Sequence, residues 1–313
     1  MNGATTHQNI LLAGASGVFG RHVTRALTEA GHQVTGLGRG AGSGVRADLL
    51  DRDALLRAVG GRHYDTVVHA ATALRKPPMR HRDMYATNAL RTAGTRNLVE
   101  AALATGARRF VAESMVFGYG YGDHGTQPLT EDRFGPRGRT PELERHIAAM
   151  RTKEQLTFET PGLAGIALRF GLFYGPGGTE ALLSMLRSRR LPVPDDQGRV
   201  LPWVELTDAA SAVVAAVERG HPGQAYNIAD RTPMGFADHV RTVAREFDLP
   251  RPLTVPHWLL KPMRYVDAVT TTTLRVSTAK AEQDLSWTPR YASPRDGLAA
   301  LARTLNAPRQ KAR

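Results

Sequence analysis

Cysteine is absent from this chain of 313 residues. The chain therefore forms no disulfide and has neither a thiolate metal ligand nor a cysteine nucleophile. No apolar run approaches the ~20 residues that a membrane-spanning helix needs. The first nine residues also lack the charged and then apolar pattern of a secretory signal peptide. We therefore expect a soluble, cytoplasmic protein without a membrane segment.

Acidic residues are few beside the basic ones: 29 Asp and Glu face 41 Lys and Arg, which gives a formal net charge of +12. The basic residues do not cluster, because the short groups at 108–109, 187–190 and 309–313 lie far apart. No basic stretch is interleaved with aromatic residues, and no two histidines stand four residues apart. We therefore expect scattered solubilising arginines, with no nucleic-acid partner and no metal site.

Short apolar runs alternate with helical patterns through the first half of the chain. The helical patterns over 18–30 and 84–105 are each followed by a glycine, Gly31 and Gly106, which is a usual C-terminal stop. Pro141 after Thr140 predicts the start of a helix that continues over 142–159. A further helix is expected at 53–59, and strands at 9–13, 33–37, 66–70, 109–113 and 165–170. This alternation predicts an α/β fold with a doubly wound parallel sheet.

A glycine-rich loop joins the first predicted strand to the first predicted helix. Gly14 permits a tight turn, Gly17 allows the backbone to approach a pyrophosphate, and Gly20 lets the helix pack closely on the strand. The free N–H groups and the positive end of the helix then attract the anion. The loop predicts a dinucleotide site formed by Gly14, Ser16, Gly17, Val18, Phe19 and Gly20.

Further motifs extend over nearly the whole length of the chain. They are Gly14–Gly20, Asp48–Leu49, Val68–Ala71, Thr87–Asn88, Gly94–Leu98, Leu168–Gly177, Val204–Asp208, Tyr226–Ile228 and Leu285–Pro289. In these the chain resembles the extended or atypical short-chain dehydrogenase/reductases, the NAD(P)-dependent epimerase/dehydratase family. The resemblance implies a Rossmann fold and a nicotinamide cofactor, with Asp48 and Leu49 flanking the adenine. It also places Ala70 and Ala71 beside the cofactor and Asn88 near the active site, and it implies a homodimer formed through the long helices.

The second half of the chain is less regular. Helical patterns occupy 179–190, 206–219 and 235–247, short strands are expected at 203–205 and 225–228, and 250–262 is a proline-rich connection. We expect a Rossmann domain over 8–171, to which 202–229 returns. A smaller substrate-binding domain is expected over 172–201 and 230–305, followed by a polar tail over 306–313.

The end of the second strand determines the expected form of the cofactor. Gly38 stands where NAD-binding members of the family carry an aspartate, and Arg39 follows it. A carboxylate there would bind a ribose 2′-OH, whereas a guanidinium pairs with a 2′-phosphate. We therefore predict NADP rather than NAD. The alternative is that Arg39 is a solvated surface residue.

The family's Tyr-x-x-x-Lys pair is missing. No tyrosine stands between Tyr121 and Tyr174, and alignment on Glu154-Gln155-Leu156 places His146 at the tyrosine and Met150 at the lysine. Lys153 stands three residues beyond Met150, about 60° away around a helix. The position of the family's serine is Glu113, with Ser114 next to it.

Four side chains remain as candidates for proton transfer. His146 has an ordinary pKa suited to proton exchange, and Ser114 is placed to bind a substrate oxygen. Tyr119 and Tyr121 follow the fourth strand in a glycine-rich loop and carry phenolic protons. Each has a structural alternative: a surface histidine, a hydroxyl bonded to backbone, and packing aromatics.

Two leucines argue against a nucleotide-sugar substrate. Family members that bind a nucleotide diphosphate have an asparagine at the position of Leu172 and an arginine near Leu201, and a buried diphosphate needs such partners. We therefore expect an NADP(H)-dependent oxidoreductase of an apolar carbonyl or polycyclic small molecule. Two alternatives stay open: an epimerase, dehydratase or cyclase without net redox change, and a non-catalytic NADP-binding sensor.

Overall fold

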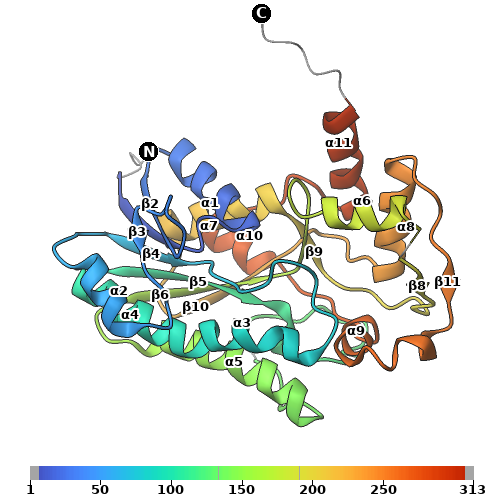
Figure 1. The fold of residues 1–313 in the computed structure, drawn as a ribbon, viewed down its shortest axis with the longest axis horizontal. Coiled ribbons are helices and arrows are strands. Elements are labelled where there is room, and N and C mark those ends of the chain that lie inside the picture. Colours follow the sequence, from blue (N-terminus) through green and yellow to red (C-terminus); the bar gives the residue numbers. More distant parts are fainter. Residues whose placement is uncertain (1–6, 133, 190, 307–313) are drawn as a thin grey trace, which may run out of the picture.

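A parallel sheet of seven strands stands at the centre of the computed structural model, in the order β10-β6-β5-β4-β1-β2-β3 (Figure 1). The structure describes residues 7–132, 134–189 and 191–306. The sheet is formed by β1 (Asn9–Ala13), β2 (Gln33–Gly38), β3 (Val45–Arg46), β4 (Thr66–His69), β5 (Arg109–Met115), β6 (Ala164–Phe170) and β10 (Gln224–Ile228). The predicted strands of this sheet and the doubly wound fold class are confirmed; β3 was not predicted.

Helices cover both faces of the sheet because its strands are apolar on both sides. In β1, Ile10 and Leu12 pack on one face, and Leu11 and Ala13 pack on the other. The first face is covered by α1 (Val18–Glu29), α7 (Leu206–Arg219) and α10 (Ala279–Leu285), and the second by α2 (Arg52–Val59), α4 (Thr95–Ala104) and α5 (Pro141–Glu159) (Figure 1).

The strand order reverses beside β1, which lies between β2 and β4. At the carboxyl end of these strands, the amide of Ala70 donates to the carbonyl of Ala13 at 2.9 Å, and the amide of Gly14 donates to that of Leu37 at 3.1 Å. Doubly wound sheets bind ligands at such a reversal. The predicted glycine loop therefore lies where this topology places a ligand.

Helix α5 is regular at its start and unusual in what it buries. Thr140 accepts a hydrogen bond from the amide of Leu143 at 3.3 Å, with Pro141 in the first turn, so the predicted cap is confirmed. Further along, the helix buries polar side chains, among them His146 and Lys153. Buried polar side chains need partners, so this face of α5 marks a candidate site.

The second half of the chain adds two small sheets and a separate hydrophobic cluster. The sheets pair β7 (Leu172–Tyr174) with β9 (Trp203–Glu205) and β8 (Val193–Pro194) with β11 (Thr254–Val255). The helices here are α6 (Glu180–Arg187), α8 (Phe236–Glu246), α9 (Arg264–Thr270) and α11 (Pro294–Asn306). The domain boundaries drawn from the sequence stay a prediction.

Some elements differ from those expected. The helix predicted over 84–105 consists of α3 (Tyr85–Ala89), a π-helical turn (Leu90–Gly94) and α4, and it follows a 3₁₀ turn (His81–Met84). The tail predicted from 306 is wrong at its first residue, because Asn306 ends α11; 307–313 lie outside the described residues. The short helices α9 and α10 carry few turns of periodic pattern, so the sequence did not reveal them.

Candidate active site

The glycine loop between β1 and α1 closes on backbone atoms. Gly14 has a φ of +92°, and a Cβ there would lie 2.7 Å from the carbonyl oxygen of Ala70. A Cβ at Gly20 would lie 2.0 Å from the carbonyl oxygen of Gly14. Gly17 precedes α1 without a side-chain cap, so N–H groups of the first turn are left for an anion. This narrow cradle fits the pyrophosphate of a dinucleotide.

The other residues predicted in this loop have different surroundings. Ser16 and Val18 are exposed beside the first turn of α1. The Phe19 ring is buried and stacks on the Phe173 ring with centroids 4.8 Å apart. Only the backbone of Phe19 is therefore directed toward the predicted pyrophosphate site. Phe19 thus anchors the N-terminus of α1 to the segment that follows β6.

Arg39 follows β2 directly, and its side chain is 70% exposed. Its guanidinium lies 3.7 Å from the carboxylate of Asp48, which also accepts a hydrogen bond from the amide of Leu50 at 3.0 Å. Leu49 is buried, and its carbonyl accepts from the Asn97 side chain at 2.8 Å. The segment predicted to flank the adenine is therefore fixed, with an accessible cation beside it.

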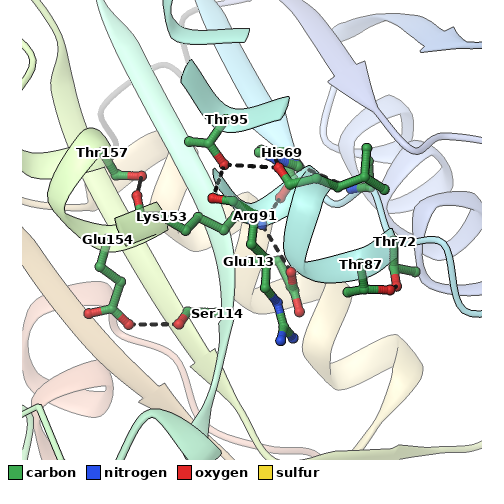
Figure 2. A network of polar contacts seen from close by, with 12 residues as sticks. His69, Thr72, Thr87, Arg91, Thr95, Glu113, Ser114, Lys153, Glu154 and Thr157 are labelled. Atoms are coloured by element: carbon green, nitrogen blue, oxygen red, sulfur yellow. Dashed lines mark hydrogen bonds and ion pairs between the residues drawn. The ribbon is translucent and has the colours of Figure 1, made fainter. Parts of the chain in front are cut away.

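Ser114 and Tyr119 both belong to one buried polar network. The Ser114 hydroxyl donates to Glu154 at 2.7 Å (Figure 2), and Arg169 donates to the same carboxylate at 2.7 Å. Arg169 also donates to the Tyr119 hydroxyl at 3.1 Å, which in turn donates to Asn227 at 2.8 Å. Burial raises the pKa of Tyr119 to about 12 despite the opposing charge of Arg169. Both hydroxyls are thus engaged by protein groups.

Glu113 and Lys153 form a second buried pair. Glu113 precedes Ser114 on β5, and Lys153 precedes Glu154 on α5. The Lys153 ammonium lies 3.0 Å from the Glu113 carboxylate and 3.4 Å from the carbonyl oxygen of His69 (Figure 2). Burial alone would raise the pKa of Glu113, but the charges of Lys153 and Arg91 outweigh it and hold that pKa below its ordinary value. Burial lowers the pKa of Lys153, and Glu113 opposes this shift.

His146 lies inside a third group, formed with Asn88 and His81. Its Nδ1 atom is 2.9 Å from the Asn88 amide nitrogen, and its Nε2 atom is 3.0 Å from Nδ1 of His81. Burial, reinforced by the charges of His81 and Arg91, lowers the pKa of His146 to about 4. At neutral pH His146 is therefore an uncharged imidazole with both nitrogen atoms engaged.

Tyr121 joins this histidine group through Tyr265 of α9. The Tyr265 ring lies edge-on to His146, with centroids 5.5 Å apart, and 6.3 Å from the Tyr121 ring. Burial and the neighbouring Tyr265 phenol raise the pKa of Tyr121 well above its ordinary value. The fold thus brings together two of the four predicted proton-transfer residues, Tyr121 and His146, and places Ser114 and Tyr119 in a separate network. All four roles stay predictions.

Sequence reasoning missed three residues of this region: His81, Tyr265 and Arg91. His81 and Tyr265 lie in segments that no motif connects to α5. Arg91 is 6% exposed and stands in the π-helical turn. An arginine inside an otherwise buried helix pattern was the one available sequence signal, since arginine is seldom buried without a purpose.

Within 7–132, 134–189 and 191–306, no three His, Asp or Glu side chains gather where they could hold a metal ion. In that same part of the chain, no helix is long and apolar enough to span a membrane.

Known proteins resemble this chain over most of its length. A Streptomyces 3-diazoavenalumate denitrifying reductase is 36% identical over 92% of this chain and 98% of the relative. A UDP-glucose 4-epimerase from Vibrio cholerae is 26% identical over 90% and 91%. A human epimerase family protein solved with NADPH superposes with a TM-score of 0.78 at 18% identity, covering 94% and 99%.

A Bordetella bronchiseptica enzyme solved with NAD⁺ superposes with a TM-score of 0.74 at 21% identity, covering 95% of this chain and 97% of that one. The model of the NAD dependent epimerase/dehydratase family matches residues 10–229. That segment contains the glycine loop, the central sheet except for the first residue of β1, and the polar face of α5. The chain is therefore an enzyme of the NAD dependent epimerase/dehydratase family.

Proposed function

We propose that this enzyme is an NADPH-dependent reductase that reduces a non-nucleotide small molecule with a hydride. The observation that carries the proposal is the state of His146, which occupies the position of the family's tyrosine. Its pKa of about 4 makes it uncharged at neutral pH, and its bonds to Asn88 and His81 engage both ring nitrogens, so it has no free proton to give to a substrate. The site therefore favours an acceptor that takes up a hydride and does not require a proton from the protein.

The preference for NADPH rests on Arg39. When bound, this cofactor supplies a hydride from its nicotinamide ring. Arg39 has one ion-pair partner, Asp48, at 3.7 Å, and that contact is exposed and weak. Its guanidinium can therefore turn to a 2′-phosphate at little cost, and Gly38 puts no carboxylate in the way.

The name of the 36% identical relative indicates an acceptor of this kind, since that protein is called a denitrifying reductase of a diazo compound. An aromatic diazonium ion accepts hydride at carbon while its C–N bond breaks, and dinitrogen leaves with the electrons of that bond. The balance requires no proton. A site that lacks the Tyr-x-x-x-Lys pair can support such a reaction.

The chain's own residues then bind and orient the reactants. The glycine loop holds the pyrophosphate, and Lys153, fixed by Glu113, presents an ammonium at the carboxyl end of β4 and β5. Tyr121 and Tyr265 provide aromatic surface next to His146. Buried Leu201 and half-buried Leu172 offer no partner for a nucleotide diphosphate.

The experiment offers NADPH with three acceptors: an aryl diazonium salt, an aromatic aldehyde and a nucleotide sugar. We expect loss of NADPH absorbance with the diazonium salt, and with NADPH deuterated at C4 we expect deuterium at the carbon that carried nitrogen. An enzyme-free mixture is the control, because diazonium salts react with reductants unaided.

Other results would identify the alternatives. Conversion of substrate without net NADPH loss identifies an epimerase, dehydratase or cyclase. Tight NADPH binding with no conversion of any acceptor identifies a cofactor sensor. Either result would contradict the proposed reductase.

A further inference from the structure

Arg91 is a largely buried residue whose guanidinium has no partner in the part of the chain that the structure describes. The residue is 6% exposed, yet among the described residues its guanidinium makes no hydrogen bond and no ion pair. Buried arginines are normally paired, because an unpaired charge in the interior is costly. The Glu113 carboxylate is the nearby anion that could pair with Arg91, but it already forms an ion pair with Lys153 at 3.0 Å. The guanidinium nitrogens are not among the fully buried polar atoms without a partner, so they reach solvent and are open to a ligand that the protein does not supply.

The surroundings of Arg91 place that ligand in the candidate active site. Its charge lowers the pKa of Glu113 on one side and acts against the raised pKa values of Tyr121 and Tyr265 on the other. Figure 2 shows the Arg91 side chain extending beside Glu113, and no dashed contact reaches its guanidinium. The residue also stands in the π-helical turn, a local irregularity that often marks functional positions.

On the other side of Arg91, aromatic rings pack against one another. The Phe117 and Tyr121 rings are stacked with centroids 5.0 Å apart, and the His81 and His146 rings are stacked at 5.2 Å. Tyr265 stands edge-on between the two stacks, 5.9 Å from His81. Aromatic rings in this arrangement favour a planar ring as their ligand, through stacked and edge-on contacts.

We propose that Arg91 is the anion receptor of the substrate site, and that the substrate is a planar aromatic carboxylate. Its carboxylate pairs with the Arg91 guanidinium, and its ring lies against Tyr121 and Tyr265. The fork of a guanidinium matches a carboxylate with two parallel hydrogen bonds, so the pair sets orientation as well as affinity. The inference rests on the proposed function only in taking this ligand as the hydride acceptor.

The test uses two probes of the same shape and different charge, cinnamate and cinnamamide. Each is titrated by calorimetry into the protein saturated with NADP⁺. We expect cinnamate to bind at least about tenfold more tightly than cinnamamide, since charge-assisted pairs out of water are the strong ones. We expect Arg91→Gln to remove that preference and Arg91→Lys to keep part of it.

Arg96→Gln is the matched control, because Arg96 lies on α4 five residues further along and is exposed. It loses the same charge and should keep the wild-type preference. The inference is overturned if Arg91→Gln still prefers cinnamate, or if the wild type does not distinguish the probes or binds neither.

A thermal melt separates recognition from a structural role. Solvent reaches the guanidinium and Arg91→Gln leaves the Lys153–Glu113 pair intact, so this variant should melt close to the wild-type temperature. A large fall in melting temperature would contradict the assignment. The binding test is independent of turnover: if cinnamate binds through Arg91 but NADPH is never consumed, the proposed reductase fails and the anion receptor stands.

Discussion

The Nε2 atom of His146 lies 3.0 Å from the Nδ1 atom of His81. Because the amide of Asn88 donates to Nδ1 of His146, the proton of neutral His146 sits on Nε2 and is donated to His81. His81 then carries its own proton on Nε2. The two rings thus form a directed chain of hydrogen bonds from buried Asn88 to half-buried His81.

His146→Gln should change the turnover of two kinds of acceptor little. An aldehyde needs a proton as well as hydride, but uncharged His146 donates its one N–H proton to His81, so its removal should not cost the ~100-fold that general acid catalysis is usually worth. A diazonium ion needs no proton, so its kcat should also change little. Steady-state rates with both acceptors check this. A fall of about 100-fold with the aldehyde alone would make His146 a general acid and contradict the proposed reaction, whereas equal losses for both acceptors would assign it a structural role, to be compared with Asn88→Ala.

Arg39→Gln should weaken the binding of NADPH and leave the binding of NADH unchanged. The loss of one charge-assisted pair with a 2′-phosphate corresponds to about 1.5 to 3 kcal/mol, or a rise in Kd of roughly 10- to 150-fold. Fluorescence titration with both cofactors measures the ratio. Arg57→Gln, which removes an exposed arginine from α2, is the control. An unchanged ratio in Arg39→Gln would show that Arg39 is a solvated surface residue.

Gly20→Ala and Gly17→Ala should separate the fold from the cofactor site. A Cβ at Gly20 meets the Gly14 carbonyl oxygen at 2.0 Å, so we expect a loss of about 3 kcal/mol or more in unfolding free energy. A Cβ at Gly17 meets that atom at 3.2 Å. Gly17→Ala should stay folded and bind NADPH more weakly. Urea unfolding and cofactor titration of both variants provide the measurement.

Lys153→Met should be severely destabilising, whereas the double variant Lys153→Met with Glu113→Gln should not. The single variant leaves the Glu113 carboxylate buried without its nearest cation, which costs about 3 to 5 kcal/mol. The double variant removes both charges and should recover most of that loss. Equilibrium unfolding of the two single variants and the double variant measures the coupling, and additive losses would mean that the ion pair contributes nothing.

The pH dependence of the free energy of unfolding should reveal the titration of Asp230. Burial, opposed by the Tyr174 hydrogen bond and reinforced by Asp208, raises the pKa of Asp230 to about 8. The folded state therefore holds a proton that the unfolded state releases at an ordinary carboxyl pKa. Stability from this group falls as pH rises toward 8, by about 1.4 kcal/mol per pH unit. Unfolding between pH 6.5 and 8 should show this fall, and Asp230→Asn should flatten it.

Local features of this chain were predictable, and distant pairings were not. The glycine loop is contiguous, and Gly14 and Gly20 have a steric reason to be there, so the sequence predicted its place in the fold. The same holds for Thr140 and Pro141, which cap α5 through neighbouring residues. His81 and His146 are 65 positions apart, and their contact depends on how α5 packs against the turn before α3.

The missing tyrosine shows the same limit for the site. The gap between Tyr121 and Tyr174 was visible in the sequence and placed the usual mechanism in doubt. What replaces the pair depends on burial, which turns His146 neutral and leaves the Arg91 guanidinium without a partner among the described residues. Neither property can be read from residue type alone, because both follow from neighbours that the fold brings in.

The π-helical turn at Leu90–Gly94 has a consequence for any comparison with relatives. A π turn accommodates one residue more than a regular α-helical turn. The motif residue Asn88 and the motif segment from Gly94 therefore do not share one helical register. A relative with an unbroken α-helix would align with this chain only through a single-residue gap inside a helix, a place where gaps are usually avoided. Residue roles carried across Arg91 by simple counting would be off by one position and by about 100° around the axis.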